Sequence, residues 1–324
     1  MERVWTWEGC FGVNPIKQIL KNFPVVILDG AMATELENYG CNLNDRLWSA
    51  KVLLENPELI KKVHLDYFQA GADCAITASY QATIEGYKEK GLTEEAAKDL
   101  IKKSVGLAQE ARDEFWAELD DKSNRPKPLV AASVGPYGAF LSDGSEYRGD
   151  YGVGKEQLKD FHRSRIELLA GAGADILACE TIPSLLEAEA IAEVLKEFPG
   201  VYAWISFSAK DSLHISNGEK AANCAKYLDG QEQVAAIGIN CTAPAFIESL
   251  IREIAQETAK PIIVYPNSGE AYDAASKTWD GKALEQRYSS DSQVWHKAGA
   301  TVIGGCCRTT PLDIEGIAAW VRNS

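Results

Sequence analysis

No apolar run in this 324-residue chain approaches the roughly 20 residues that a membrane-spanning helix requires. The first ten residues, MERVWTWEGC, contain neither a long apolar stretch nor a small-residue cleavage site. A secretory signal peptide needs both features. We therefore expect neither a membrane partner nor a secreted protein.

Basic residues are also scarce, since 33 Lys and Arg stand against 47 Asp and Glu, a formal net charge of −14. Nucleic-acid-binding proteins need the opposite balance, so no nucleic-acid partner is expected. The eight cysteines are spread along the chain, mostly inside apolar runs. That distribution is unlike the disulfide framework of a small secreted domain. We expect a cytoplasmic protein in a reducing compartment, with small-molecule partners and as a monomer or a weak oligomer.

Histidine occurs only four times, at His64, His162, His214 and His296. All four fall on expected helices or in a loop, and none falls at the end of an expected strand. We expect them on the surface or on helix faces, which disfavours a histidine-based hydrolytic zinc site. A Gly-x-Gly-x-x-Gly motif after the first strand is absent as well, which excludes the simplest form of dinucleotide binding.

Short apolar runs alternate with segments of helical periodicity along most of the chain. The runs predict buried strands, and the segments between them predict amphipathic helices. The expected strands are residues 25–28, 74–77, 129–134, 175–179, 201–207, 235–239, 261–264 and 301–303. The expected helices are residues 57–70, 93–116, 155–170, 184–198, 219–228, 244–258, 283–298 and 311–321. Gly71, Gly171 and Gly299 are expected to end the helices that precede them.

Buried strands that alternate with helices predict a parallel sheet, and eight such units favour a single-domain α/β fold, the (β/α)8 TIM barrel. The barrel is expected to occupy residues 15–324, after an N-terminal extension over residues 1–14 with no assigned role. Two insertions rich in Gly, Asp, Ser and Tyr, residues 137–154 and 270–282, follow strands. Such loops lie on the C-terminal face of a barrel, where active sites are built.

Polar residues at the ends of the expected strands are the candidates for chemistry. They are Asp29, Tyr80, Gln81, Glu180, Asn240, Cys241, Asn267, Ser268, Cys306 and Cys307. Because the ends of alternating barrel strands face a common mouth, residues from distant parts of the sequence can meet there.

The pair Cys306–Cys307 directly follows Gly304–Gly305, an arrangement poorly suited to filling a core. The two glycines are expected to break the strand through dihedral angles closed to other residues, so that both thiols face one ion. A lone cysteine on a strand, such as Cys241, is ordinarily an inert core residue. At the end of the sixth strand, however, Cys241 can supply a third thiolate. Three cysteine ligands with one open position are the arrangement of a catalytic Zn2+ site.

Four segments together resemble the homocysteine S-methyltransferase family: Asp29–Gly30, Gly238–Cys241, Tyr265–Glu270 and Gly304–Pro311. The resemblance extends from about Pro15 to the C-terminus. It implies a TIM barrel that binds Zn2+ through Cys241, Cys306 and Cys307 and methylates L-homocysteine to methionine. The chain is most similar to the branch that uses S-methylmethionine, with S-adenosylmethionine as a second donor. Betaine-using relatives carry a further C-terminal segment and fit less well; use of betaine or selenohomocysteine stays open.

Substrate-binding roles follow from position and from the resemblance. Glu180, assisted by Asp29, is expected to hold the homocysteine ammonium, as the matching acidic residues do in the family. Gly30, Asn240 and Ser268 are the other expected contacts to substrate. No side chain is assigned as a general acid or base, because the nucleophile is the thiolate of the substrate itself.

Aromatic residues near the strand ends are candidates for the donor site. Trp48, Tyr80 and Tyr265 are expected to face the sulfonium methyl group through cation–π contacts, although ordinary packing explains each equally well. Thr181 follows Glu180 where betaine-using relatives have a tyrosine.

Two other classes of function remain open from the sequence. In one, a non-catalytic barrel uses a vicinal Cys306–Cys307 disulfide as a redox switch, which does not need Cys241. In the other, a zinc hydrolase keeps a metal-bound water and a general base.

Overall fold

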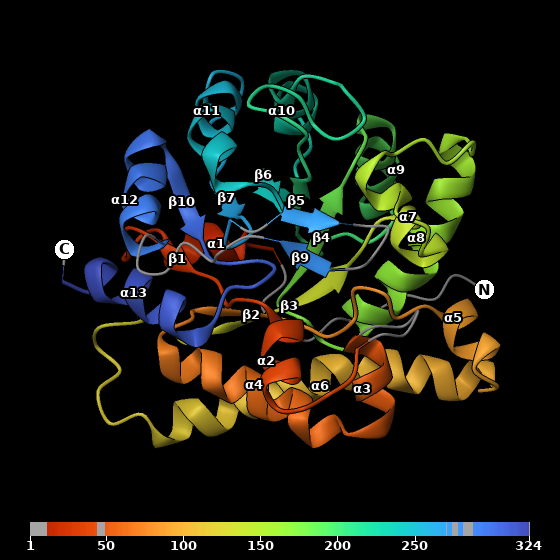
Figure 1. Cartoon of the computed structure of the whole chain (residues 1–324), viewed down its shortest axis with the longest axis horizontal. Coiled ribbons are helices and arrows are strands. Elements are labelled where there is room, and N and C mark those ends of the chain that lie inside the picture. The colour runs from red at the N-terminus through yellow and green to blue at the C-terminus, as the bar shows by residue number, and fades with distance from the viewer. Residues whose placement is uncertain (1–11, 44–48, 270, 274–277, 281–287, 324) are drawn as a thin grey trace.

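Eight parallel strands curl around a common axis at the centre of the molecule, with helices around them (Figure 1). The computed structural model describes residues 12–43, 49–269, 271–273, 278–280 and 288–323. The barrel strands are β1 (Val26–Ile27), β2 (Cys74–Ile76), β3 (Leu129–Val134), β4 (Ile176–Ile182), β5 (Ala203–Phe207), β6 (Val234–Asn240), β7 (Ile262–Tyr265) and β10 (Ala300–Ile303). All eight overlap the expected strands.

The ring closes through β1, the shortest strand. β1 pairs with β10 at Val26 and Val302, and the order continues β10-β7-β6-β5-β4-β3-β2. A parallel bridge between Leu28 and Cys74 then joins β1 to β2, and the Asp29 amide donates to the Cys74 carbonyl at 3.0 Å. The predicted (β/α)8 barrel is confirmed.

The core has two layers. Between strands and helices lies a continuous apolar shell, while a second cluster fills the barrel interior around the fully buried Trp204 and Tyr265. A short helix, α1 (Pro15–Ile19), adds Ile16 and Ile19 to this inner cluster. Asn14, the N-cap of α1, donates from Nδ2 to the Ala235 carbonyl at 3.1 Å. Helix α1 therefore covers the N-terminal end of the barrel.

Seven of the longer helices begin and end within three residues of the expected limits, and residues 283–287 of the expected helix 283–298 lie outside the described residues. The longer helices are α4 (Pro57–Ala70), α6 (Glu94–Glu118), α8 (Lys155–Gly171), α9 (Leu185–Leu195), α10 (Ala221–Asp229), α11 (Pro244–Ala255), α12 (Tyr288–Ala298) and α13 (Pro311–Val321). Short helices were not predicted, because one or two turns are too few to establish a period of 3.6 residues. They are α2 (Met32–Asn38), α3 (Ser49–Glu55), α5 (Ile84–Glu89) and α7 (Tyr137–Leu141). None of the helices in the described part of the chain is both long and apolar enough to span a membrane.

All three expected glycines lie at helix C-termini, but they differ in conformation. Gly71 and Gly299 take left-handed dihedrals, with φ of 113° and 127°, directly after α4 and α12. Gly171, in contrast, is the last residue of α8. The left-handed residue there is Gly173, with φ of 84°, two residues after the end of the helix.

The two insertions contain regular structure that was not predicted. The first holds α7 and a 3-10 turn, η1 (Ser145–Tyr147). The second holds an antiparallel ribbon of β8 (Ala271–Asp273) and β9 (Thr278–Asp280), with Tyr272 paired to Trp279. Strands of three residues flanked by polar residues give too little alternation to be recognised in sequence.

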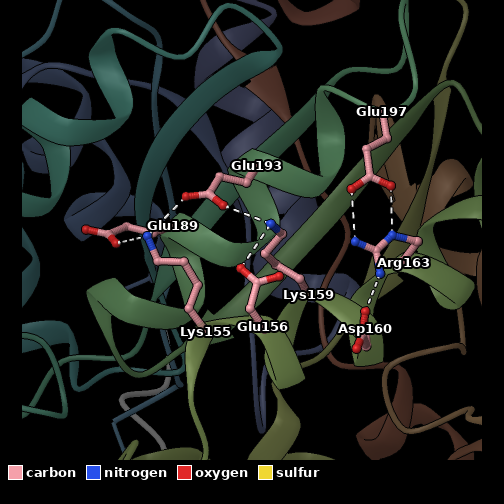
Figure 2. Close-up of polar contacts among 8 residues, drawn as sticks. All are labelled: Lys155, Glu156, Lys159, Asp160, Arg163, Glu189, Glu193 and Glu197. Carbon is pink, nitrogen blue, oxygen red and sulfur yellow. Dashed lines mark hydrogen bonds and ion pairs between the residues drawn. The ribbon is translucent and has the colours of Figure 1, made fainter.

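An ion-pair ladder joins the outer faces of α8 and α9 (Figure 2). Lys155 contacts Glu189 and Glu193, and Lys159 contacts Glu193 as well. Further along, Arg163 pairs with Glu197 through two donors, at 2.7 and 3.0 Å. The ladder aligns the helix that precedes β4 with the helix that follows it.

Candidate metal centre and active site

Three cysteine sulfurs meet at the C-terminal mouth of the barrel. Cys241 follows β6, Cys306 and Cys307 follow β10, and the three Sγ atoms lie within 4.8 Å of one another. The Sγ atoms of Cys306 and Cys307 are 3.9 Å apart. Two thiolates bound tetrahedrally to one zinc at about 2.3 Å would lie about 3.8 Å apart. The donor set therefore fits a metal ion, and the spacing of Cys306 and Cys307 matches that of two ligands of one ion.

The structure joins Cys241 to Cys306 as a disulfide, with the sulfurs 2.50 Å apart, and Cys307 is a free thiol. Cys306 and Cys307, the pair of the redox alternative, are not bonded to each other in this structure. Cys241 and Cys306 lie close together because the backbone of each is bonded to the end of β7, the strand between β6 and β10. The Cys241 amide donates to Tyr265, and the Cys306 amide donates to Pro266 at 2.8 Å.

The two glycines before the cysteines are needed for close packing rather than for unusual dihedrals, which corrects the expectation. Neither has a left-handed φ. A Cβ on Gly304 would overlap Leu28, and one on Gly305 would overlap Thr309. Left-handed dihedrals occur instead at three non-glycine residues of the site, Thr181 with φ of 59°, Cys241 with φ of 46° and Arg308 with φ of 69°. Such strained backbone gathers at functional sites.

Two buried carboxyl groups lie at the same mouth. Asp29, at the end of β1, accepts from the Ile76 amide at 2.8 Å, and Glu180, within β4, accepts from Ser133 Oγ. Burial raises the pKa of Glu180 to about 7. Burial also raises the pKa of Asp29 well above its usual range, and the charge of Glu180 adds to the effect. Neither carboxyl forms an ion pair within the described residues, so both suit a cationic ligand.

A model of the homocysteine S-methyltransferase family matches residues 26–321. The chain is 61% identical over 311 residues to the homocysteine S-methyltransferase YbgG of Bacillus subtilis, covering 96% of this chain and 99% of that protein. It is 53% identical over 308 residues to the homocysteine S-methyltransferase of Escherichia coli, covering 94% and 98%. The chain belongs to the homocysteine S-methyltransferase family. The predicted family and enzyme class are confirmed.

The solved structures agree with this assignment. The metallated form of the Escherichia coli homocysteine methyltransferase MmuM superimposes with a TM-score of 0.86 at 50% identity, covering 95% of this chain and all of that one. Its barrel supports the fold described above. That relative has a metallated form, and in this chain Cys241, Cys306 and Cys307 are placed so that they could hold a metal ion.

Asn240 and Ser268, both expected to contact substrate, lie at the mouth and hold backbone. Asn240 Oδ1 accepts from the Thr181 amide at 2.7 Å, and its Nδ2 donates to Thr181 Oγ1 at 2.8 Å. These bonds hold Thr181 in a left-handed conformation, with φ of 59°, directly beside Glu180. The Ser268 amide donates to the Cys307 carbonyl at 3.0 Å.

Gly30 allows a close approach behind Asp29. A Cβ there would lie 2.9 Å from both Tyr67 OH and Thr309 Oγ1. Tyr67 OH in turn donates to the Ala31 carbonyl at 3.1 Å. The glycine thus lets the end of β1 pack against the segment that follows the paired cysteines.

The three aromatic candidates for the donor site differ in placement. Tyr265 is fully buried in the barrel interior, where its hydroxyl accepts from Trp204 Nε1 at 3.0 Å and lies 2.7 Å from Ser206 Oγ. Tyr80 is half-buried at the mouth, where it interacts with the Thr181 side chain. Trp48 lies outside the described residues.

All four histidines lie on helices or in a loop, as expected, but only two of them reach the surface. His64 and His162 are fully buried, whereas His214 and His296 are partly exposed. His64 lies on the face of α4 that packs into the apolar shell, and His162 lies 2.8 Å from Glu187 Oε1. No histidine joins a metal-binding group among the described residues.

Three polar residues of the barrel interior escaped the sequence analysis. Ser133 forms a hydrogen bond with Glu180, and Trp204 forms one with Tyr265. Ser206 forms hydrogen bonds with both Tyr265 and Asn240. Each lies inside an apolar run that predicted a buried strand. A serine within such a run must find a partner, and that requirement was the available signal.

Proposed function

We propose that this enzyme transfers a methyl group from a sulfonium donor, S-methylmethionine or S-adenosylmethionine, to the sulfur of L-homocysteine, which yields methionine. We propose Zn2+ as the metal and Cys241, Cys306 and Cys307 as its ligands. The observation that carries the proposal is the convergence of three cysteine sulfurs and two buried carboxyl groups at one barrel mouth. When bound, Zn2+ would lower the pKa of a coordinated substrate thiol.

The protein groups divide the substrate between them. Glu180 and Asp29 bind the α-ammonium of homocysteine. This cation supplies the positive partner that the two buried carboxyl groups lack within the protein. Asn240 holds the backbone next to Glu180 and thereby fixes the direction of the carboxylate. The sulfur is then presented towards the cysteines after β6 and β10.

The donor brings its own activation, because a sulfonium already carries the positive charge that makes its methyl group electrophilic. The displacement needs no protein acid, and the main contribution of the enzyme is alignment of the two sulfurs. The acidic mouth favours a cationic donor over a neutral one. Tyr80, half-buried at this mouth, is the described aromatic candidate for contact with the donor.

Metal analysis of the reduced protein tests the ligand set. We expect about one zinc per chain, the stoichiometry of a three-cysteine catalytic site, in the wild type and in Cys41→Ala, whose thiol lies outside the cluster. We expect none in Cys241→Ala. Zinc retained by Cys241→Ala would contradict the proposed site.

A parallel assay of homocysteine with S-methylmethionine, S-adenosylmethionine and betaine tests the reaction. Methionine should form with the sulfonium donors, and selenohomocysteine can replace homocysteine in a matched series. Absence of methionine with all three donors would contradict the proposed reaction. Because the ligands must be reduced thiols, we propose that the enzyme works in the cytoplasm.

A further inference from the structure

Glu187 is a fully buried carboxylate that takes no part in the proposed chemistry. It lies in the first turn of α9, where its amide is capped by Ser184 Oγ at 3.3 Å. Its Oε1 accepts from the Tyr137 amide at 2.6 Å and lies 2.8 Å from His162 Nε2. Its Oε2 accepts from Tyr151 OH at 3.0 Å. One carboxylate thus holds both ends of the segment 137–151.

Every partner of the Glu187 carboxylate acts as a donor. Burial lowers the pKa of His162, so the imidazole is neutral, and only a proton on Nε2 satisfies the carboxylate. Burial and the neighbouring Glu187 raise the pKa of Tyr151, which keeps its hydroxyl protonated. An ionised carboxylate accepts at both oxygens, whereas a glutamine side chain cannot. The arrangement therefore depends on glutamate at this position.

The segment between the two anchors crosses the top of β4. Gly138 packs directly on the backbone of Ser145 and Glu146, and η1 contacts β4. Further on, a Cβ on Gly149 would lie 3.2 Å from Ser184 Cβ, at the start of α9. Helices α7, α8 and α9 lie on the same side of the barrel (Figure 1). The segment therefore covers the β3 and β4 part of the mouth.

The start of this segment packs against Tyr80, since a Cβ on Gly135, just before it, would lie 2.9 Å from the Tyr80 ring. Burial raises the pKa of Tyr80, and Tyr147 and Glu146 add to the effect. Glu146 has a buried Oε2 with no hydrogen-bond partner among the described residues. The cysteines lie across the mouth, after β6 and β10, with β5 between β4 and β6. When homocysteine binds with its sulfur at the cysteines and its ammonium at Glu180, the part of the mouth beside Tyr80 is left for the methyl donor.

We propose that Glu187 is a positioning residue that holds segment 137–151 in place as the wall of the donor half of the site. The inference rests on the proposed function. Held in this way, Glu146 presents a carboxylate to the cationic donor. Release of the segment would displace Glu146 and Tyr147 and leave the homocysteine contacts at Glu180 and the cysteines unchanged.

The test compares Glu187→Gln with Glu193→Gln, which removes the same charge from the same helix on its solvent side. In Glu187→Gln we expect kcat/KM for the sulfonium donor to fall about tenfold, since displaced binding groups cost factors of this order. The KM for homocysteine should stay within about twofold, because its contacts are untouched. Trypsin should cleave faster after the exposed Arg148. Glu193→Gln should match the wild type in all three measurements.

Tyr151→Phe is the milder variant, because it removes one donor and leaves the His162–Glu187 contact. It should shift the same two readouts in the same direction, and it decides the matter if Glu187→Gln fails to fold. If the wild type is active and the folded variants keep its kcat/KM for the donor, the inference is wrong and the proposed function stands. An equal change for both substrates would also overturn the inference, because it indicates a general loss of structure. An inactive wild type would overturn the proposed function itself.

Discussion

Glu180 combines deep burial with a carboxyl group that no basic side chain in the described structure neutralises. Burial raises its pKa to about 7, although hydrogen bonds from Ser133 and Tyr265 act in the opposite direction. Near neutral pH the group is therefore partly protonated. Only the ionised form attracts an ammonium group, so the affinity for homocysteine should depend on pH in this range.

We predict that the KM for homocysteine falls as pH rises from 6 to 8, because Glu180 becomes ionised above its pKa of about 7. Glu180→Gln should raise that KM at pH 8 by about 10-fold or more, the cost of losing a charge-assisted hydrogen bond. It should also remove the titration near pH 7. Glu248→Gln, on an exposed part of α11, loses a charge without these effects. Identical pH profiles in the wild type and Glu180→Gln would assign the titration to another group.

Gly304 illustrates a second kind of constraint on a single residue. We predict that Gly304→Ala lowers the free energy of unfolding by about 1–3 kcal/mol, the cost of overpacking, because its Cβ would overlap Leu28. Gly106→Ala, within α6 and with open space around the new Cβ, should instead stabilise by roughly 1 kcal/mol. Urea unfolding of both variants measures the difference. A Gly304→Ala protein as stable as the wild type would show that β1 and the cysteine loop can separate.

At the scale of elements, the ladder between α8 and α9 joins the two helices through charges near the surface (Figure 2). Arg163 and Glu197 are 35% and 41% exposed, so water screens most of their attraction. We predict a coupling energy of at most about 1 kcal/mol in an Arg163→Ala and Glu197→Ala double-mutant cycle, decreasing in added salt. Thermal or urea unfolding provides the four free energies. A larger coupling that salt does not change would indicate a dry interface.

Element positions could be predicted wherever hydrophobic periodicity was long enough to identify a strand or helix. β3 and the helices α4 and α13 were placed with their observed limits, because an apolar run or a Pro at the first turn marks them. The ribbon β8–β9 and the short helices gave no such pattern. Their positions depend on tertiary contacts that local sequence does not encode.

The site was predictable to the same extent. The three cysteines and the two acidic residues were found because each follows or ends a predicted strand, and the barrel brings strand ends together. The hold of Asn240 on Thr181 and the anchoring by Glu187 were not found. Both depend on which neighbouring backbone groups lack partners, a property that only the folded structure defines.

For the whole molecule, one buried ion pair joins the last helix to the first strands. Asp73, fully buried at the start of β2, accepts from the Ile27 amide at 3.1 Å and from Arg322 Nη2 at 2.6 Å. Arg125 lies 3.9 Å from the same carboxylate and binds the carbonyls of Phe68 and Ala72. The network links α13 to the junction of β1 and β2, where the barrel ring closes.

We predict that Arg322→Ala lowers the free energy of unfolding by about 3–5 kcal/mol near neutral pH, because it leaves a buried carboxylate with one distant cation. Burial already raises the pKa of Asp73. Loss of Arg322 raises it further, so the folded variant favours protonated Asp73, and its stability falls as pH rises above the unfolded pKa of about 3.9. The deficit relative to the wild type should therefore be smaller at pH 5 than at pH 8. Arg252→Ala, which breaks an exposed pair with Glu248, should change stability by less than about 1 kcal/mol at both pH values. If Arg322→Ala were no less stable than Arg252→Ala, the ion pair between α13 and the junction of β1 and β2 would not contribute to the stability of the barrel.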